Sequence, residues 1–373
     1  MAKRDDAAYL SVGEREVRIS SPGRVIYEAT ERTPEVTKLM VAEYYATVGD
    51  PMMRSIGLRP CALERWPDGW REGMQLATPI RDGRPEYHGP KATAGDGFFQ
   101  KVLPKGAPDY VETAHVTFPS GRTQDELCPT EPAALVWAAQ MGTLTFHPWP
   151  VRRGPDAASL DHPDELRLDF DPYGATGFAD AKRVAVAARE LLAELGVTGY
   201  LKTSGNRGLH LYVRIEPAHS FEDVRHAAIG IGQELSRRDP DGVTVNWWKE
   251  ERGDRIFIDF NQNNRDRTIA SAYSLRAKSG APVSTPITWD ELESLADPKE
   301  LNLVTVPPLV SERDPWQGMD DVHHDLEPLM ALWDGVETNF PPDYPKMPGE
   351  PPRVQPSKKR ADHWDDEGNR IGT

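Results

Sequence analysis

Residues 166–171, which read Leu-Arg-Leu-Asp-Phe-Asp, decide how the rest of this chain is interpreted. Apolar and polar residues alternate, which predicts a β-strand because successive strand side chains point to opposite faces. The apolar residues would enter a core, whereas Arg167, Asp169 and Asp171 would line the other face. The two carboxylates would then lie about 6 to 7 Å apart along the strand. Such a pair predicts a bound cation.

Two later segments repeat this pattern: residues 209–214, Leu-His-Leu-Tyr-Val-Arg, and residues 255–260, Arg-Ile-Phe-Ile-Asp-Phe. Three strands with one polar face each predict one cleft. Asp169, Asp171 and Asp259 are hard oxygen donors, which suit Mg²⁺ or Mn²⁺ better than zinc. Two such ions could activate one oxygen and stabilise a leaving oxygen. The Asp-x-Asp pattern alone is weakly specific, because a solvated strand face also produces it.

The turn Ser-Gly-Asn-Arg-Gly at residues 204–208 precedes His210 and is bounded by glycines. Its exposed backbone N–H groups, with Ser204, Arg207 and His210, are donors suited to phosphate oxygens. Structural alternatives stay open: a turn-forming serine, a solvated arginine and a buried histidine. Phe98 and Phe99 are adjacent in an expected strand and cannot both face inward, so one is free to stack on a base.

Composition sets the broad class. A chain of 373 residues can form one large domain or two lobes. The net charge is −15, but residues 289–373 hold 19 acidic and 8 basic residues, a net of −11, which leaves −4 for residues 1–288. A basic groove for nucleic acid therefore remains compatible with the total. Two cysteines exclude a disulfide framework and a cysteine-rich zinc site. No apolar run reaches a membrane span and no signal peptide is visible, which predicts a cytoplasmic protein without membrane contact.

Local patterns predict an alternation of short strands and amphipathic helices. The expected strands lie at 15–28 with a central turn, 59–70, 112–117, 143–147 and 199–203, and the expected helices lie at 33–49, 131–141, 176–195 and from Ser220 onward. Residues 71–97 predict a long loop or hairpin insertion. Residues 341–373 are rich in proline and charge, which is typical of an extended tail.

The order Asp-Phe-Asp, Ser-Gly-Asn-Arg-Gly-Leu-His and Ile-Phe-Ile-Asp resembles the three motifs of archaeo-eukaryotic primases. It is most similar to the polymerase domain of bacterial ligase D and its stand-alone relatives, over about residues 15–310, and residues 267–292 add to the similarity. The resemblance implies an α/β (α+β) fold with an RRM-like catalytic sheet of antiparallel or mixed strands. Helices would flank this sheet, beside a smaller N-terminal β-rich lobe. The catalytic domain would span 1–310, and an acidic, Pro-rich extension 311–373.

The resemblance also implies roles for individual residues. The metal ligands, which are also the catalytic residues, would be Asp169, Asp171 and Asp259. The nucleotide would be held by His147, near its sugar, and by Ser204, Arg207, His210, Arg252, Gln262 and Arg276. Contacts to the template and to DNA are expected from Phe98, Phe99 and Lys101, with Arg24 and Lys38 as stand-ins for residues that grip a downstream 5′-phosphate. Two departures are Glu64, where relatives carry a lysine, and the longer 71–97 insertion.

The expected function is a template-directed primase-polymerase that adds nucleotides, preferably ribonucleotides, to a DNA primer and fills short gaps in repair with two Mn²⁺ or Mg²⁺ ions. Because the 5′-phosphate residues are sparse, a stand-alone enzyme of the Prim-PolC type is favoured: a nucleoid-associated monomer with a separately encoded DNA ligase. The alternative is the polymerase component of bacterial non-homologous end joining. Other classes are a metal-dependent phosphodiesterase, which would need the triphosphate donors less, and a non-catalytic DNA-binding scaffold.

Overall fold

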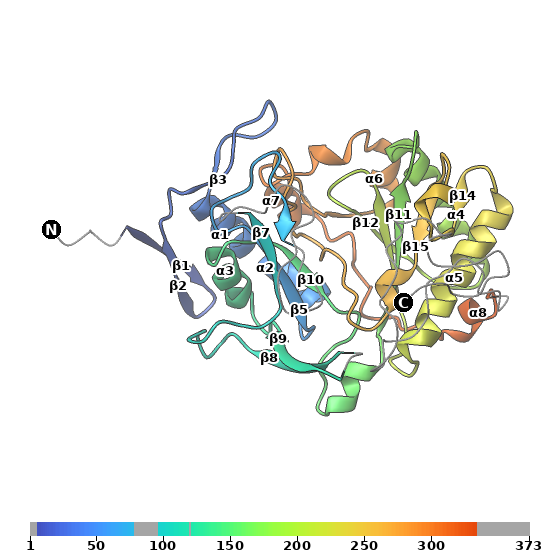
Figure 1. Ribbon diagram of the computed structural model, residues 1–373, viewed down its shortest axis with the longest axis horizontal. Coiled ribbons are helices and arrows are strands. Elements are labelled where there is room, and N and C mark those ends of the chain that lie inside the picture. The colour runs from blue at the N-terminus through green and yellow to red at the C-terminus, as the bar shows by residue number, and fades with distance from the viewer. Residues whose placement is uncertain (1–5, 78–95, 119–120, 334–373) are drawn as a thin grey trace, which may run out of the picture.

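The computed structural model describes residues 6–77, 96–118 and 121–333, which form two lobes lying side by side (Figure 1). The N-terminal lobe is built on a six-stranded sheet in which β6, β7, β5, β9 and β8 are neighbours in that order and β10 also pairs with β5. Its elements are β1 (Ala7–Val12), β2 (Arg15–Ser20), β3 (Val25–Tyr27), β4 (Val36–Thr37), α1 (Lys38–Thr47), α2 (Gly49–Ile56), β5 (Cys61–Arg65), β6 (Leu76–Ala77), β7 (Gly97–Gln100), β8 (Thr113–Thr117), β9 (Thr123–Leu127), α3 (Pro132–Gln140) and β10 (Thr143–Pro148).

The second lobe contains another six-stranded sheet, with the order β14-β15-β11-β13-β12-β16. Only β14 and β15 run parallel, so the sheet is mixed, as expected. Its elements are η1 (Ala157–Asp161), β11 (Glu165–Pro172), α4 (Phe178–Glu194), β12 (Tyr200–Thr203), β13 (Leu209–Arg214), α5 (Phe221–Arg238), β14 (Val243–Thr244), η2 (Lys249–Glu251), β15 (Ile256–Asp259), η3 (Asn261–Asn263), β16 (Pro286–Ile287), α6 (Trp289–Ser294), η4 (Pro298–Glu300), α7 (Val306–Glu312) and α8 (Glu327–Met330).

One face of this second sheet is apolar and covered by helices. Leu166, Leu168 and Phe170 of β11 are fully buried, as the alternation predicts. Helices α4 and α5 pack on this side of β11, away from the N-terminal lobe (Figure 1). The opposite face, which carries the polar residues, is therefore turned toward the N-terminal lobe.

Helix boundaries follow local capping chemistry. In α5, Ser220 accepts a hydrogen bond from the N–H of Asp223, whose carboxylate accepts one from the N–H of Ser220. This confirms the predicted helix start. The first helix ends at Thr47, close to the predicted end, but a second helix that was not predicted begins at Gly49, because Pro51 lies in its first turn, where the missing N–H is tolerated.

The structure also adds elements that the sequence patterns did not predict. Strand β9 (Thr-Gln-Asp-Glu-Leu) lacks apolar alternation, but it pairs with β8 over its whole length. Strand β6 lies within the predicted insertion 71–97, whose residues 78–95 lie outside the described residues, and it pairs with β7, the strand expected at Phe98 and Phe99. Cys61 and Cys128 are buried and free, as expected.

Residues 311–333 pack on the second lobe. The indole N–H of Trp316 donates to the carbonyl of Leu201 at 2.9 Å, and Trp333 stacks on His226 with 3.5 Å between ring centroids. Helix α8 packs against α5. The compact part thus continues past the predicted boundary at 310, and the tail beyond 333 lies outside the described residues. No helix among the described residues is long and apolar enough to cross a membrane.

Candidate active site

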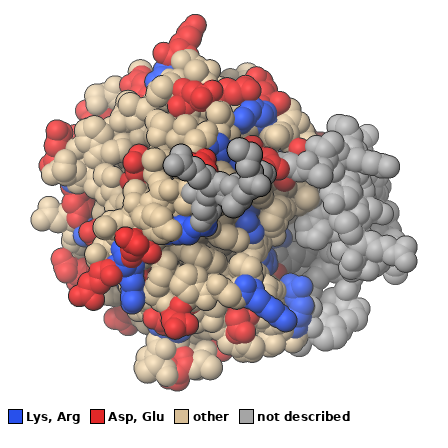
Figure 2. All heavy atoms as spheres, turned by 90° about the vertical axis from the view of Figure 1, so that its left-hand side faces the viewer, with Lys and Arg blue, Asp and Glu red and all other residues tan. Residues whose placement is uncertain are grey.

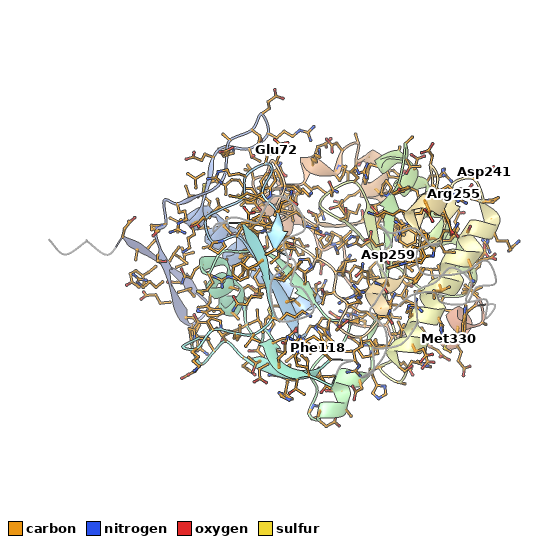
Figure 3. The ribbon with its side chains drawn as sticks, in the orientation of Figure 1. Glu72, Phe118, Asp241, Arg255, Asp259 and Met330 are labelled. Carbon is orange, nitrogen blue, oxygen red and sulfur yellow. The ribbon has the colours of Figure 1, made fainter. Side chains whose placement is uncertain are left out.

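Four polar side chains form a row across four neighbouring strands on the face turned toward the N-terminal lobe. Asp169 on β11 is paired in register with Asp259 on β15 and with His210 on β13, and His210 is paired with Lys202 on β12. Residues opposite one another in antiparallel strands share a face. Asp171 follows Asp169 on the same face, two residues along the strand. The structure thus brings the three predicted carboxylates together, and Figure 3 places Asp259 between the lobes.

Burial and mutual repulsion shape the ionisation of this group. Burial, followed by Asp171 and Asp259, raises the pKa of Asp169 well above its usual value. Burial and Asp259 likewise raise the pKa of Asp171, and burial raises that of Asp259. The backbone N–H of Asn261 donates to Asp259 at 2.8 Å, and Gln262 donates to the same carboxylate at 3.3 Å. Like charges in register are unfavourable, so a divalent cation would stabilise this group.

The donor set therefore fits Mg²⁺ or Mn²⁺. No group of three or more His, Cys, Asp or Glu side chains within 6–77, 96–118 and 121–333 already has the geometry of a metal site. A complete protein cage is not needed for this chemistry, because such ions usually keep waters and bind substrate phosphates beside one or two carboxylates.

The turn at residues 204–208 lies against β11. Gly205 has a φ of +72°, and a Cβ on Gly208 would come within 2.5 Å of the carbonyl oxygen of Phe170, so both positions require glycine. The Ser204 hydroxyl accepts hydrogen bonds from the N–H groups of Asn206 (3.2 Å) and Gly208 (3.1 Å). In this state the serine stabilises the turn.

Two arginines lie at this turn, Arg207 within it and Arg276 beside it. Arg276 donates to the Ser204 carbonyl at 2.9 Å, and the exposed Arg207 donates to the Pro172 carbonyl at 3.2 Å. Arg276 lies close enough to lower the pKa of Asp169, and Arg207 that of Asp171. A third candidate, Arg252, is buried with its guanidinium 3.5 Å from the centroid of the Phe257 ring, and it donates to the carbonyls of Asn246 and Trp247.

Lys202 is a buried site residue that the sequence interpretation missed. Its Nζ lies 2.7 Å from Nδ1 of His210 and donates to the Ser284 hydroxyl at 2.5 Å. Nε2 of His210 lies 3.6 Å from Oδ1 of Asp169. Burial, with Lys202 and then Arg276, lowers the pKa of His210 well below its usual value. The available signal was its place opposite His210 in the predicted strand pair.

His147, on β10, is held by Glu64 on the neighbouring strand β5 of the N-terminal sheet. Nε2 of His147 lies 3.0 Å from Oε2 of Glu64, whose other oxygen accepts the indole N–H of Trp66, also at 3.0 Å. The Phe99 ring is 41% exposed and meets the His147 ring edge-on, with 5.2 Å between centroids. His147 and Phe99, two predicted site residues far apart in sequence, thus lie in contact.

A cavity of about 690 Å³ adjoins this contact. Glu64 and Trp66 line it from the N-terminal lobe, and Asn206 and Arg276 line it from the second lobe. It therefore connects the Glu64–His147 pair with the turn at 204–208, and its size suits a small ligand.

The predicted DNA-contacting residues occupy the N-terminal lobe. Lys38 is buried and bonds to Ser20 and Gln140, and burial, together with Arg24, Arg18 and Arg65, lowers its pKa to about 8. Arg65 in turn lies over the Phe98 ring at 5.2 Å. Arg24 is exposed and pairs with Asp68 at 2.9 Å. Lys101 is separate from this group and lies over Phe118. Figure 2 shows acidic and basic side chains interspersed over this side of the molecule.

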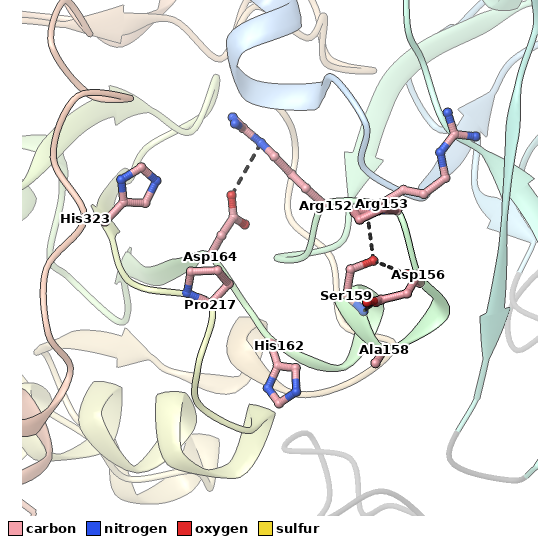
Figure 4. Close-up of a pocket in the computed structure, with 11 residues that line it drawn as sticks. Arg152, Arg153, Asp156, Ala158, Ser159, His162, Asp164, Pro217 and His323 are labelled. Carbon is pink, nitrogen blue, oxygen red and sulfur yellow. Dashed lines mark hydrogen bonds and ion pairs between the residues drawn. The ribbon is translucent and has the colours of Figure 1, made fainter.

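A second cavity, of about 480 Å³, lies at the opposite end of β11 from the aspartates (Figure 4). Arg152, Arg153, His162 and Asp164 are among its lining residues. Arg153 donates to Glu112 and to the Thr113 carbonyl, and Arg152 donates to the Arg54 carbonyl. These cations are already engaged, so the cavity is not part of the candidate active site.

The mixed sheet with its row of carboxylates, beside a glycine-bounded turn rich in donors, defines an archaeo-eukaryotic primase-like nucleotidyltransferase. The model for the family "LigD, primase-polymerase domain" matches residues 37–316. The chain belongs to this family, as the resemblance predicted.

Individual proteins that resemble this chain belong to the same family. The LigD end-joining protein of Pseudomonas aeruginosa is 33% identical over 304 residues, which is 80% of this chain and 32% of that protein. The Mycolicibacterium smegmatis protein is 30% identical, over 76% of this chain and 33% of that protein. The chain thus spans about a third of the length of these curated relatives. The polymerase domain of Mycobacterium tuberculosis ligase D, solved in complex with DNA, matches with a TM-score of 0.68 and 28% identity, covering 83% of this chain and 99% of that domain.

The predicted fold and enzyme class are confirmed by these matches. Polymerase domains of this family are in general metal-dependent. The relatives' names favour end joining, the alternative expected from the sequence, over a stand-alone gap-filling enzyme. The individual residue roles and the domain boundary at 310 stay predictions.

Proposed function

We propose that this protein is the polymerase component of a bacterial end-joining system, which adds nucleotides to a DNA primer opposite a template. The observation that carries this proposal is the row formed by Asp259, Asp169 and His210 in register across β15, β11 and β13. It places paired carboxylates next to donors suited to a triphosphate.

We expect the phosphates of the nucleotide to contact the second lobe and its base to contact the N-terminal lobe. Arg207, Arg276 and the N–H groups of the turn at 204–208 would bind the phosphates, because guanidinium groups pair with phosphate oxygens. His210 would donate from Nε2, since Lys202 occupies its Nδ1 side. The exposed Phe99 would stack on a base. Together these contacts would hold the nucleotide between the turn and the N-terminal lobe.

Asp169, Asp171 and Asp259 would hold two Mn²⁺ or Mg²⁺ ions. When bound, such ions activate the primer 3′-hydroxyl and stabilise charge on the transferred phosphate and on the departing pyrophosphate. The carboxylates would hold the ions at fixed positions on the sheet. Asp259 is itself held in place by hydrogen bonds from the backbone N–H of Asn261 and from the side-chain amide of Gln262.

The finer statements belong to the same proposal: ribonucleotides preferred, short gaps filled during joining, a DNA ligase as partner, and a monomer acting on the nucleoid in the cytoplasm. The structure of the M. tuberculosis relative in complex with DNA supports a DNA substrate. The backbone N–H of Lys38 donates to the Arg24 carbonyl at 2.8 Å, so these two residues lie together on the N-terminal lobe, which supports a 5′-phosphate contact there.

The test is extension of a labelled primer across a short DNA gap, with ribonucleotides or deoxyribonucleotides and with Mg²⁺ or Mn²⁺. An Asp169→Ala/Asp171→Ala protein is the control. We expect wild-type extension, faster with ribonucleotides, that stops in the control. Wild-type shortening of the primer that depends on the aspartates would instead establish a phosphodiesterase. No aspartate-dependent reaction would leave a DNA-binding scaffold. A second substrate, two DNA ends with short complementary overhangs, tests the end-joining role.

A further inference from the structure

We propose that Glu64 is a positioning residue that fixes the tautomer of His147, so that Nδ1 of the imidazole faces the nucleotide as an acceptor and selects a sugar that carries a hydroxyl donor. This inference rests on the proposed function, since it assigns a role in recognising the incoming nucleotide. It begins from the buried contact between Nε2 of His147 and Oε2 of Glu64, at 3.0 Å.

The donors and acceptors around Glu64 determine which nitrogen of His147 carries the proton. Trp66 occupies one carboxylate oxygen of Glu64 with its indole N–H, which can only donate. An ionised carboxylate can only accept, so the ring nitrogen that faces it must carry the proton. Burial alone would raise the pKa of Glu64, but the hydrogen bonds from His147 and Trp66 and the charge of Arg276 lower it to about 2. Burial lowers the pKa of His147. A neutral ring with its proton on Nε2 has a lone pair on Nδ1.

The position of this lone pair is open. Within the described part of the chain, Nδ1 of His147 has no hydrogen-bond partner, and the side chain keeps 11% of its surface accessible. All the recorded polar contacts of the ring are on the Nε2 side. A ligand that covered this acceptor without offering a donor would leave it buried and unpaired, which is costly, so we expect the ligand group at this position to be a hydrogen-bond donor.

The surroundings identify which part of a nucleotide supplies that donor. On one side of the ring lies Phe99, the exposed aromatic residue expected to stack on a base. Arg276 lies close enough to lower the pKa of His147, and it donates to the Ser204 carbonyl in the turn at 204–208, where phosphates are expected. The sugar connects base and phosphate in every nucleotide. The group that meets Nδ1 is therefore a sugar hydroxyl.

Glu64 would otherwise be unfavourable in this place. It lines the same cavity as Asn206 and Arg276 and puts a negative charge where a polyanion is expected to bind. A buried carboxylate needs strong partners to remain, and its two partners here are an indole and the imidazole that it orients. Control of the histidine tautomer gives this charge a function.

The test is Glu64→Gln, which keeps the shape of the side chain. Because Trp66 can only donate, it holds the amide oxygen, and the amide NH₂ then faces His147. The ring must accept at Nε2 and move its proton to Nδ1, which reverses its hydrogen-bonding character toward the sugar. The matched control is Glu126→Gln, since Glu126 is also a buried glutamate that accepts an indole N–H, from Trp149 at 3.0 Å, in the same sheet.

Two measurements read the outcome. Nitrogen-15 NMR of histidine-labelled protein, with the His147 signals assigned by their loss in His147→Asn, gives the tautomer directly. We expect the proton on Nε2 in wild type and in Glu126→Gln, and on Nδ1 in Glu64→Gln. Primer extension gives kcat/KM for a ribonucleotide, its 2′-deoxy form and its 2′-fluoro form. We expect the ribo-to-deoxy and ribo-to-fluoro ratios to fall about five- to tenfold in Glu64→Gln, the equivalent of one hydrogen bond.

Each of the two measurements can contradict a different part of the proposal. A wild-type proton on Nδ1, or an unchanged tautomer in Glu64→Gln, overturns the positioning role whatever the activity. A switched tautomer with unchanged sugar ratios overturns the selection step. Absence of any nucleotide addition by wild type rejects the proposed function and the selection step with it, while the NMR result still decides whether Glu64 sets the tautomer.

Discussion

The two ends of strand β11 carry the same kind of side chain in opposite electrostatic settings. At its end, Asp169 and Asp171 lie with Asp259, and their pKa values are raised. At its start, Arg59 donates to both Asp164 and Glu165 at 2.5 to 2.9 Å. There, burial alone would raise the pKa of Asp164, but Arg59 and Arg214 lower it to about 2.

This difference separates a binding site from a structural contact. At the start of β11, each carboxylate has guanidinium partners from both lobes, including Arg167 and Arg214, which are buried in the sheet. That network joins the lobes and needs no ligand. At the other end, burial raises the pKa of all three carboxylates, which is a setting that a divalent cation would stabilise. Acidic side chains at the start of β11 thus stabilise the fold, whereas those at its end form the candidate binding site.

The largest expected effect tests the unpaired end. Asp169→Asn should reduce nucleotide addition by at least about 10³-fold, as removal of a central catalytic group usually does, because it removes the carboxylate between Asp259 and His210. Single-turnover primer extension measures the loss, and circular dichroism checks that the fold is kept. Addition within tenfold of wild type would show that this group is not catalytic.

The next effect concerns the paired end. Arg59→Met leaves Asp164 and Glu165 buried with fewer partners and should lower the free energy of unfolding by about 3 to 5 kcal/mol, the usual result of breaking a buried pair. Urea denaturation measures it. Arg15→Met is the control, because Arg15 pairs with Glu131 at the surface and its loss should leave the midpoint unchanged. Equal midpoints for both variants would contradict a structural role for the buried network.

The third expected effect is stabilisation of the protein by a metal ion bound at the aspartate end of β11. Mn²⁺ should stabilise wild type by about 3 kcal/mol when present at roughly 100 times its dissociation constant, because it relieves the repulsion among the aspartates. Thermal unfolding with Mn²⁺ and after its removal by EDTA measures the shift. Asp169→Asn should show a smaller shift. A shift of equal size in both proteins would place the bound ion elsewhere.

The smallest effect is the pH dependence of the metal-free protein. The aspartates at the site have a raised pKa, so the folded state binds protons more tightly there, and stability should fall as pH rises from about 4 through their folded values. Asp164 and Glu165 have a lowered pKa, so their contribution should be present above about pH 4 and lost as pH falls toward 2. Each pKa unit corresponds to about 1.4 kcal/mol.

Urea midpoints across pH 2 to 8 measure both trends. Asp169→Asn should flatten the upper trend and leave the lower one. If the variant keeps the wild-type slope above pH 4, repulsion among the aspartates does not control it.

Much of this fold was predictable from local pattern. The alternation in residues 166–171 predicted which side chains of β11 are buried, and Ser220 with Asp223 predicted the start of α5. Strand β9 was missed because its stability comes from pairing with β8 rather than from its own composition. The second helix at Gly49 was missed because proline is read as a helix breaker, although it is favoured in the first turn.

As with the fold, part of the candidate site was predictable from the sequence. Motif order predicted the aspartates, the turn at 204–208 and His147. Lys202 escaped notice although it lies two residues before the turn, because its contact with His210 depends on the pairing of β12 with β13; the partner of His147 escaped notice because it lies 83 residues away in sequence. Glu64 stood out in the sequence as a departure from relatives, but its role was not visible before its contact with His147 was known.

The sequence by itself determined which residues face the polar side of each strand, because side-chain direction in a strand depends only on parity along the chain. It also determined where the turn at 204–208 can form, since glycine alone accepts the φ of +72° at Gly205 and the close approach at Gly208 without strain. Only the tertiary structure decided the register that sets Asp169 between Asp259 and His210, and the pairing of β5 with β10 that brings Glu64 to His147. Those contacts depend on burial and pairing between segments up to about a hundred residues apart, which no local pattern encodes.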